Sequence, residues 1–217
     1  IWSALQLAKK EILIPEEGGW ITYKQYPKKL KLKLTEVKTE NAILNLDDLK
    51  EKSKTADLLI YQNPGGYFAE QPMKEIYQVC QKNNCLVVLD VSGSLGTDLC
   101  QGEYADILVC SFGKWKLVEA KGGGFISCQD KKLFNQIKSS FKILSDQKQL
   151  EIIEEKLEHL NSRITFLLNK REGIIKDLKE FKVLNKDHFG LVVVIKGDQK
   201  KIIKYCQKNN LEYTQCP

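Results

Sequence analysis

Histidine, arginine and methionine are scarce in this chain, and their scarcity narrows the kinds of site that it can hold. The 217 residues include 2 His and 1 Met, and Arg163 and Arg171 are the only arginines. The two histidines, His159 and His188, lie away from any group of cysteines. Because zinc and similar ions need clustered Cys and His ligands, we expect no metal site.

The sequence also lacks any CxxC pair, although it contains 7 cysteines. An odd number of cysteines without paired spacing argues against a disulfide framework. Cys85, Cys110 and Cys128 lie in apolar, strand-like runs, where a reduced thiol behaves as a small hydrophobic group. We therefore expect free thiols and a cytoplasmic protein.

Long hydrophobic runs are missing as well. No apolar run approaches the roughly 18–20 residues that cross a bilayer, so we predict no membrane association. The sequence shows no signal-peptide pattern, and it begins at Ile1 inside what reads as a helix, so we expect residues to precede it. The net charge of +6 comes from lysine. Nucleic-acid surfaces usually combine arginine with aromatic residues, so we predict a solvated, lysine-rich surface and no nucleic-acid partner.

What is present is a regular alternation of strands and helices over the first 130 residues. Strands are predicted at 11–15, 31–37, 56–62, 85–90, 105–111 and 123–128, and helices at 44–52 and 70–84. Apolar strands that alternate with helices are typical of a parallel sheet covered on both faces. The predicted fold class is therefore α/β, with a three-layer α/β/α core.

The pattern changes after about residue 130, where long amphipathic helices begin. Helices are predicted at 131–141, 148–181 (unbroken or broken once) and 198–210, and strands at 189–197 and 211–215. We interpret residues 1–145 as a large domain. Residues 146–217 are interpreted as a long connecting helix with a small α+β domain.

Three polar loops follow strands of the predicted sheet, and all three belong on one rim. They are NPGG (63–66), DVSGS (90–94) and SFGKWK (111–116). In such sheets, ligands bind at the carboxyl ends of the strands. Asp90 could hold a pyridinium nitrogen protonated, or it could be an ordinary cap at a strand end. Ser111 could bind a phosphate, or it could be part of a turn.

The loop after Ser111 contains two candidate nucleophiles, Lys114 and Lys116. A lysine amine in a partly buried site can form a covalent bond with a carbonyl group, whereas most lysines are simply solvated. Trp20 could stack on a flat cofactor ring, or it could belong to the core. Asn63 could bind a ring hydroxyl, or it could be part of an Asn-Pro-Gly turn.

The order of these segments resembles that of the fold-type I pyridoxal-phosphate enzymes over nearly the whole chain. The matching features are Trp20 after ILIP, the run LNLDDLKEKSKTADLLIY, NPGG before PMKEIYQVCQKNN, Asp90 with Gly96, and ADILVCSF before KLVEAKGG. The chain looks most similar to the DegT/DnrJ/EryC1/StrS sugar aminotransferases. In that family the reactive lysine lies five residues after the serine and seven before a glycine pair, and Lys116 has both spacings.

The resemblance implies a cofactor, a reaction and a partner. Pyridoxal phosphate would be bound covalently to Lys116, with Asp90 at the ring nitrogen, Trp20 stacked on the ring, Ser111 at the phosphate and Asn63 at the ring hydroxyl. The reaction would be a transamination between a small-molecule amino donor and a keto acceptor, including a nucleotide sugar. A homodimer is also implied.

The chain departs from the family pattern at several positions. Gly93 and Leu95 stand where the family has glutamine and histidine, and the family's Ser-Gly-Thr phosphate loop would fall at or before Ile1. One alternative is therefore an inactive relative of these enzymes that acts as a dimeric binding or regulatory protein. Another is a class V lyase or desulfurase that uses Lys114 and a mobile Cys100.

Overall fold

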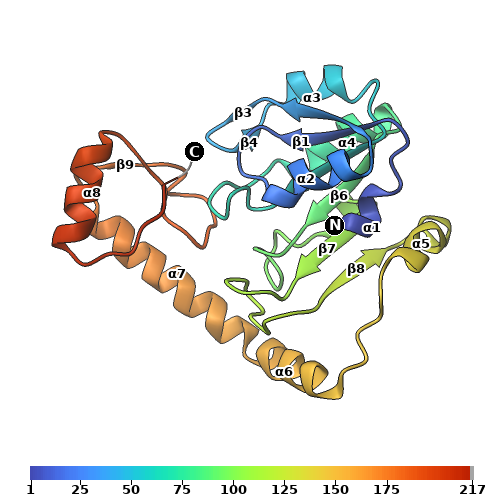
Figure 1. The fold of residues 1–217 in the computed structure, drawn as a ribbon. Helices are drawn as coiled ribbons and strands as arrows, with labels where there is room; N and C mark the ends of the chain where they lie inside the picture. Colours follow the sequence, from blue (N-terminus) through green and yellow to red (C-terminus); the bar gives the residue numbers. More distant parts are fainter. Residues whose placement is uncertain (216–217) are drawn as a thin grey trace.

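The protein is built around a six-stranded sheet, which the computed structural model shows together with its helices (Figure 1). The structure describes residues 1–215, so Cys216 lies outside the described residues. The strands are β1 (Glu11–Pro15), β2 (Lys33–Val37), β5 (Leu58–Gln62), β6 (Leu86–Asp90), β7 (Ile107–Ser111) and β8 (Gly124–Cys128). Their order across the sheet is β2-β1-β5-β6-β7-β8.

The sheet is parallel except at one edge. Strands β1, β2, β5, β6 and β7 pair in parallel, as predicted, whereas β8 pairs with β7 in the antiparallel direction. A loop without a helix, residues 112–123, joins β7 to β8, where a parallel pair would need a crossover that is usually helical. The chain therefore turns back at the carboxyl end of β7.

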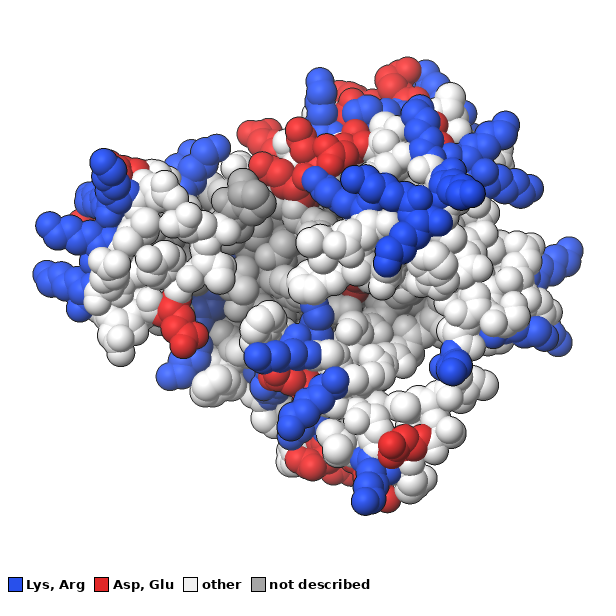
Figure 2. Space-filling model, viewed as in Figure 1, with Lys and Arg blue, Asp and Glu red and all other residues white. Residues whose placement is uncertain are grey.

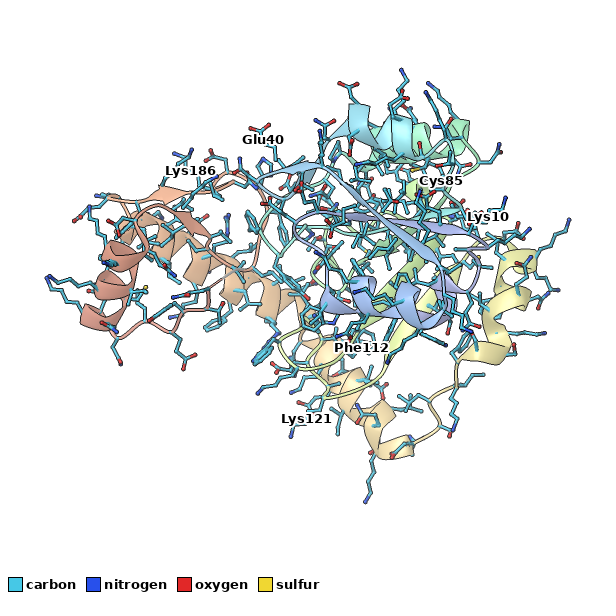
Figure 3. The ribbon with its side chains drawn as sticks, turned by 45° about the horizontal axis from the view of Figure 1, so that its top comes forward. Lys10, Glu40, Cys85, Phe112, Lys121 and Lys186 are labelled. Carbon is cyan, nitrogen blue, oxygen red and sulfur yellow. The ribbon has the colours of Figure 1, made fainter. Side chains whose placement is uncertain are left out.

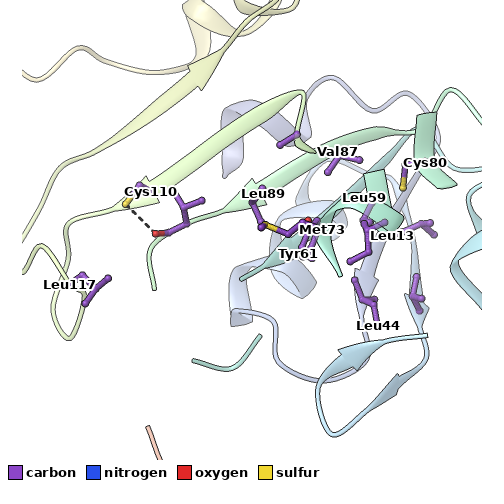
Figure 4. Close-up of a cluster of buried hydrophobic side chains, with 14 of the residues drawn as sticks. Leu13, Leu44, Leu59, Tyr61, Met73, Cys80, Val87, Leu89, Cys110 and Leu117 are labelled. Atoms are coloured by element: carbon purple, nitrogen blue, oxygen red, sulfur yellow. Dashed lines mark hydrogen bonds between the residues drawn. The ribbon is translucent and has the colours of Figure 1, made fainter. Parts of the chain in front are cut away.

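Helices cover both faces of the sheet, which confirms the three-layer α/β/α prediction. The helices of this part are α1 (Trp2–Leu5), α2 (Ile21–Lys29), α3 (Leu46–Lys52), α4 (Met73–Lys82) and α5 (Lys131–Ile137), with the 3-10 turns η1 (Gly102–Tyr104) and η2 (Lys138–Ser140). Alternate strand residues point to opposite faces. Leu59 and Tyr61 pack towards α3 and α4 (Figure 4), and Leu58 and Ile60 pack towards α1, α2 and α5.

The strand ends define two distinct edges of the core. Lys10 and Cys85 directly precede β1 and β6, and Phe112 directly follows β7. Figure 3 shows Lys10 and Cys85 at one edge of the core, with Phe112 well away from them. The edge that carries Phe112 is the carboxyl edge, where the polar loops were predicted to meet.

Helix α2 is a feature that the sequence did not predict. Its N-cap residue, Trp20, makes no side-chain capping bond, and Pro27 lies inside the helix. Proline and a missing cap both weaken a local helix signal. The helix is held mainly by tertiary packing of its buried residues Tyr23 and Pro27. The short hairpin of β3 (Thr39–Glu40) and β4 (Ile43–Leu44) was also not predicted.

Beyond the sheet, the chain continues through two consecutive helices into a small C-terminal part. The elements are α6 (Gln147–Glu158), α7 (Leu160–Asp177), β9 (Lys182–Val183), β10 (Ile195–Lys196) and α8 (Gln199–Lys208). The predicted long helix is broken once, at His159. Figure 1 shows α7 leading away from the sheet towards α8. The division at residue 145 stays a prediction.

The strands predicted for the C-terminal part are largely wrong. The predicted strand 189–197 is reduced to β10, which pairs with β9, and residues 211–215 form no strand. The reason is that the backbone N–H groups of Phe189 and Leu191 bond to Glu70 and Tyr67 of the large part. These donors are therefore not available to a sheet.

Arg171 organises the segment that follows α7. Its side chain is buried, and its guanidinium donates hydrogen bonds to the carbonyl oxygens of Asn185 (3.1 Å), Lys186 (3.2 Å) and Val192 (3.2 Å). Burial lowers the pKa of Arg171. The Asn185 side chain in turn donates to the carbonyl of Asn41 (2.9 Å).

Lysine side chains are spread over the surface, as predicted from the composition. Figure 2 shows Lys and Arg side chains scattered over the face in view, densest near α2, above a hollow that is mostly uncharged. Lys24, Lys28 and Lys29 of α2 are exposed. Within residues 1–215, no helix is long and apolar enough to span a membrane, and no group of three or more His, Cys, Asp or Glu is placed to hold a metal ion.

We predict that Arg171→Met lowers the free energy of unfolding by about 2 kcal/mol or more, because three carbonyls lose their bonds to a buried, charged donor. Urea denaturation followed by circular dichroism measures the change. Lys170→Met, on the exposed side of the same helix, is the matched control, with an expected change within about 0.5 kcal/mol. Equal stability of the two variants would contradict the role given to Arg171.

Candidate active site

A cavity of about 610 Å³ opens at the carboxyl ends of the central strands. The residues on its floor come from strand ends or follow them directly, and they are Gln62, Asp90, Ser92 and Ser111. The residues on its rim come from the loops and α2, and they include Trp20, Thr22, Tyr67, Lys114 and Lys116. Four of the five sequence-predicted site residues therefore lie around one cavity, and Asn63 does not line it.

Asp90 is the buried charge on the cavity floor, with an exposed fraction of 4%. Its carboxylate accepts hydrogen bonds from the Tyr23 hydroxyl (2.8 Å), the Ser92 hydroxyl (2.5 Å) and the Ser92 N–H (3.0 Å). Burial, together with the Asp90 charge, raises the pKa of Tyr23 well above its ordinary value, so Tyr23 remains a donor. These bonds compensate for taking a carboxylate out of water.

Ser111 is connected to Asp90 through Ser92. The Ser111 N–H donates to the Ser92 hydroxyl (2.9 Å), and the Ser111 hydroxyl accepts from the Gly113 N–H (3.2 Å). The ends of β6 and β7 are thus held together by a chain of polar contacts. Ser111 lies where it could contact a ligand in the cavity.

Lys116 differs from Lys114 in its surroundings. The Lys116 amine hydrogen-bonds to the Tyr67 hydroxyl, which places it beyond the hydroxyl end of that ring, 4.9 Å from the ring centroid, and it lies 4.3 Å from the centroid of Trp20. Lys114 is exposed, and its amine lies 4.7 Å from the ring of Trp115, which is 74% exposed. A cation against an aromatic ring that also hydrogen-bonds to a hydroxyl is held more firmly than one on the surface.

The loop that carries Lys116 is braced from α7. Arg163 of α7 donates to the Lys116 carbonyl (3.3 Å) and to the Glu119 carboxylate (3.0 Å). Glu119 also accepts a bond from the Trp115 N–H (3.0 Å). These contacts fix the backbone on both sides of Lys116.

Asn63 lies beneath the site. It is fully buried, and its side-chain oxygen accepts a hydrogen bond from the Gln71 N–H (3.0 Å). Side chains alternate between the two faces of a strand, so residues 62 and 63 point in opposite directions. In the structure, Gln62 lines the cavity and Asn63 supports the NPGG loop.

Gln62 is the floor residue that sequence reasoning missed. It is 3% exposed, and its amide nitrogen has no hydrogen-bond partner among residues 1–215. Gln62 pairs in register with Asp90 on the neighbouring strand. The alternation of side chains along strands could have identified Gln62, because Gln62 and Asp90 end adjacent parallel strands and point to the same face.

The cysteines near the site are poor candidates for a nucleophile. Cys110 lines the cavity, but burial raises its thiol pKa and its sulfur donates to the Val91 carbonyl (3.9 Å), drawn as the dashed line in Figure 4. Cys100 is not among the described residues that line the cavity, and burial raises its pKa too. The arrangement therefore gives no support to the desulfurase alternative.

No protein-family model matches the sequence, and no curated protein matches it either. Solved structures do match. The histidinol-phosphate aminotransferase from Clostridium acetobutylicum superposes with a TM-score of 0.76 at 12% identity, over 97% of this chain and 69% of that one. A pyridoxal-phosphate-bound candidate aminotransferase from Clostridium difficile 630 gives 0.71 at 16% identity, over 88% and 58%. A cysteine desulfurase from Thermococcus onnurineus NA1 gives 0.63 at 14% identity, over 97% and 65%.

These similarities establish the fold. The chain has the fold of the pyridoxal-phosphate-dependent transferases, as the resemblance implied. It spans less than two thirds of the length of two of these three neighbours. The narrower resemblance to the sugar aminotransferases stays a prediction, since the three neighbours are named for other activities.

We predict that iodoacetamide modifies half-buried Cys128 at least about tenfold faster than buried Cys110 in the folded protein at pH 8, because a buried thiol forms little thiolate. Mass spectrometry of the digested protein at timed intervals measures both rates. Denatured protein, in which the two rates should converge, is the control. Equal rates in the folded protein would contradict the burial and bonding given for Cys110.

Proposed function

We propose that the chain binds pyridoxal phosphate covalently through Lys116 and functions as an aminotransferase. The observation that carries the proposal is the position of the Lys116 amine. It lies between Trp20 and Tyr67 on the rim of a cavity whose floor holds the buried carboxylate of Asp90. A lysine amine and a carboxylate for the pyridinium nitrogen are two of the groups that hold this cofactor, and a flat ring can stack on it.

The polar groups of the cavity fit such a ligand. The Gln62 amide nitrogen and the Thr22 hydroxyl are buried and lack partners within the described chain, and both residues line the cavity. Buried polar groups without partners are costly, so a polar ligand that bonds to them would be stabilised. This observation supports a bound cofactor rather than an empty relic of the fold.

Each residue has a separate task in the proposed site. Asp90, whose carboxylate is oriented by the Tyr23 and Ser92 donors, would bind the protonated ring nitrogen. Trp20 would stack on the ring, and Ser111 would bind the phosphate. The ring hydroxyl, predicted from the sequence to meet Asn63, would meet Gln62, with Asn63 supporting the loop.

The bound cofactor supplies an electron sink that stabilises negative charge on the substrate carbon. Lys116 would remove and return the proton at that carbon, acting as general base and then as general acid. Trp20 and Tyr67 would keep its amine near the reacting carbon and restrict the access of water.

The substrates would be a small-molecule amino donor and a keto acceptor, with a nucleotide sugar as one candidate acceptor. A homodimer is proposed from the resemblance. Because the chain spans only part of its structural neighbours, the activity of the whole assembly also belongs to the proposal.

We predict that the protein mixed with pyridoxal phosphate develops the visible-edge absorbance of a lysine adduct, which borohydride reduction fixes on Lys116. Lys116→Ala abolishes the band, because the amine that forms the bond is removed. Lys114→Ala, two residues away and exposed, is the matched control and keeps the band. Absence of the band from the unaltered protein would overturn the proposed function, and the reverse lysine pattern would overturn the assignment of Lys116.

We predict that Gln62→Ala weakens binding of pyridoxal phosphate about tenfold, the effect of losing one buried hydrogen bond to the ligand. Absorbance titration measures the dissociation constant. Gln207→Ala, on the exposed face of α8, should leave it unchanged. An unchanged constant for Gln62→Ala would show that its amide does not contact the cofactor.

A further inference from the structure

Tyr67 is an unexpected neighbour of the reactive lysine. It lies in the loop after β5, outside the residues that the sequence singled out. Its hydroxyl hydrogen-bonds to the Lys116 amine, and the ring centroid of Trp20 lies 4.3 Å from the same amine. The amine is therefore held by two contacts, the Tyr67 hydroxyl and the Trp20 ring.

The ring of Tyr67 can occupy this place only because residue 93 is glycine. A Cβ atom at Gly93 would lie 2.7 Å from Cδ1 and 2.9 Å from Cε1 of the Tyr67 ring. Contacts below 3.0 Å force a shift of the ring, since real Cβ atoms hardly ever approach so closely. The departure at position 93 is thus coupled to the presence of Tyr67.

The backbone of Tyr67 is held by the C-terminal part of the chain. Its φ of +66° is unusual for a residue with a side chain, so external contacts must maintain it. The Leu191 N–H donates to the Tyr67 carbonyl (2.8 Å). Gly190 makes this approach possible, because a Cβ atom there would lie 2.8 Å from the Tyr67 oxygen and 2.9 Å from the Phe68 Cα.

Further contacts fasten the same two segments together. The Phe189 N–H donates to the Glu70 carboxylate, and the Glu70 N–H donates to the His188 ring (3.1 Å). Arg171 of α7 binds the Val192 carbonyl on the far side (3.2 Å). The segment 188–192 is therefore clamped between α7 and the loop that carries Tyr67.

We propose that Tyr67 is a positioning residue for Lys116, and that the C-terminal segment 188–192 holds Tyr67 in place. A lysine side chain is long and flexible, and ordering it costs entropy. The Tyr67 hydroxyl accepts a hydrogen bond from the ammonium form of Lys116 and donates one to the neutral amine. Both protonation states are thus directed into the cavity before a ligand arrives, which preorganises the site.

Segment 188–192 contributes no residue to the described lining of the cavity, and its proposed role is to hold Tyr67. The role of Tyr67 depends on the proposed role of Lys116, but its test needs no cofactor. Acetic anhydride labels free amines, and mass spectrometry reads Lys116 and Lys114 in the same molecule. The ratio of their rates compares Lys116 with an exposed lysine on the same loop. Only variants that circular dichroism shows to be folded are compared, because unfolding would expose Lys116 as well.

Tyr67→Phe should raise the Lys116:Lys114 labelling ratio about fivefold, the factor given by loss of one hydrogen bond. Gly190→Ala should raise the ratio in the same direction, because it pushes the segment away from the Tyr67 carbonyl. Gly93→Ala displaces the Tyr67 ring from the opposite side and leaves the C-terminal segment intact. It should therefore raise the ratio as well, and it keeps the positioning role of Tyr67 testable if Gly190→Ala fails to fold.

Two matched controls belong to the C-terminal part itself. Tyr205→Phe removes a hydroxyl that donates to the Asp177 carbonyl, and Gly197→Ala adds a methyl whose nearest neighbour is 3.9 Å away. Both should keep the unaltered ratio. An unchanged ratio in Tyr67→Phe overturns the proposal that Tyr67 positions Lys116. An unchanged ratio in folded Gly190→Ala overturns the proposal that segment 188–192 holds Tyr67. Failure of pyridoxal phosphate to form an adduct with the unaltered protein concerns the proposed function only.

Discussion

The buried carboxylate of Asp90 is the constraint on which the rest of the site depends. A lone ionised carboxylate in a protein interior is strongly unfavourable, so its donors must be in place when the chain folds. Tyr23 can donate only if α2 packs across the end of β6, and Ser92 can donate only if the chain turns directly after Asp90. Because Ser92 also binds the Ser111 N–H, the same carboxylate aligns the end of β7. One buried charge thereby ties three elements to the cavity floor.

The single antiparallel pairing of the sheet complements this floor. A helical crossover after β7 would carry the chain away from the carboxyl edge, whereas the loop 112–123 keeps it there before β8 begins. Lys116 lies on that loop, which places its side chain at the rim of the cavity. Arg163 of α7 holds the loop from outside. The parallel strands thus supply the floor, and the reversal of direction brings the Lys116 amine to the rim.

Local patterns predicted the sheet and most of its polar rim, since strand ends and loop glycines are read from short stretches of sequence. The same patterns failed for α2, whose signal is weakened by Pro27 and an uncapped start. They failed again at 189–197, an apolar run that looks like a strand, because its N–H groups bond to a loop about 120 residues earlier in the chain. Tyr67 was missed for a similar reason, since its neighbours Lys116 and Leu191 are distant in sequence.

Residue 93 shows how a departure from the pattern that the sequence resembles can be matched by a change in its surroundings. In the sequence, Gly93 stands where the family that the chain resembles has glutamine. In the structure, the Gln62 amide nitrogen lies 3.4 Å from the place of a Cβ at residue 93, and the Tyr67 ring lies closer still. A side chain at residue 93 and the present position of Tyr67 exclude each other sterically. An amide is therefore still present at this point of the cavity, supplied from the neighbouring strand, and the space left by glycine is filled by the ring that contacts Lys116. A side chain at residue 93 would have to displace Tyr67, so a glutamine there and the present contact between Tyr67 and Lys116 are mutually exclusive arrangements.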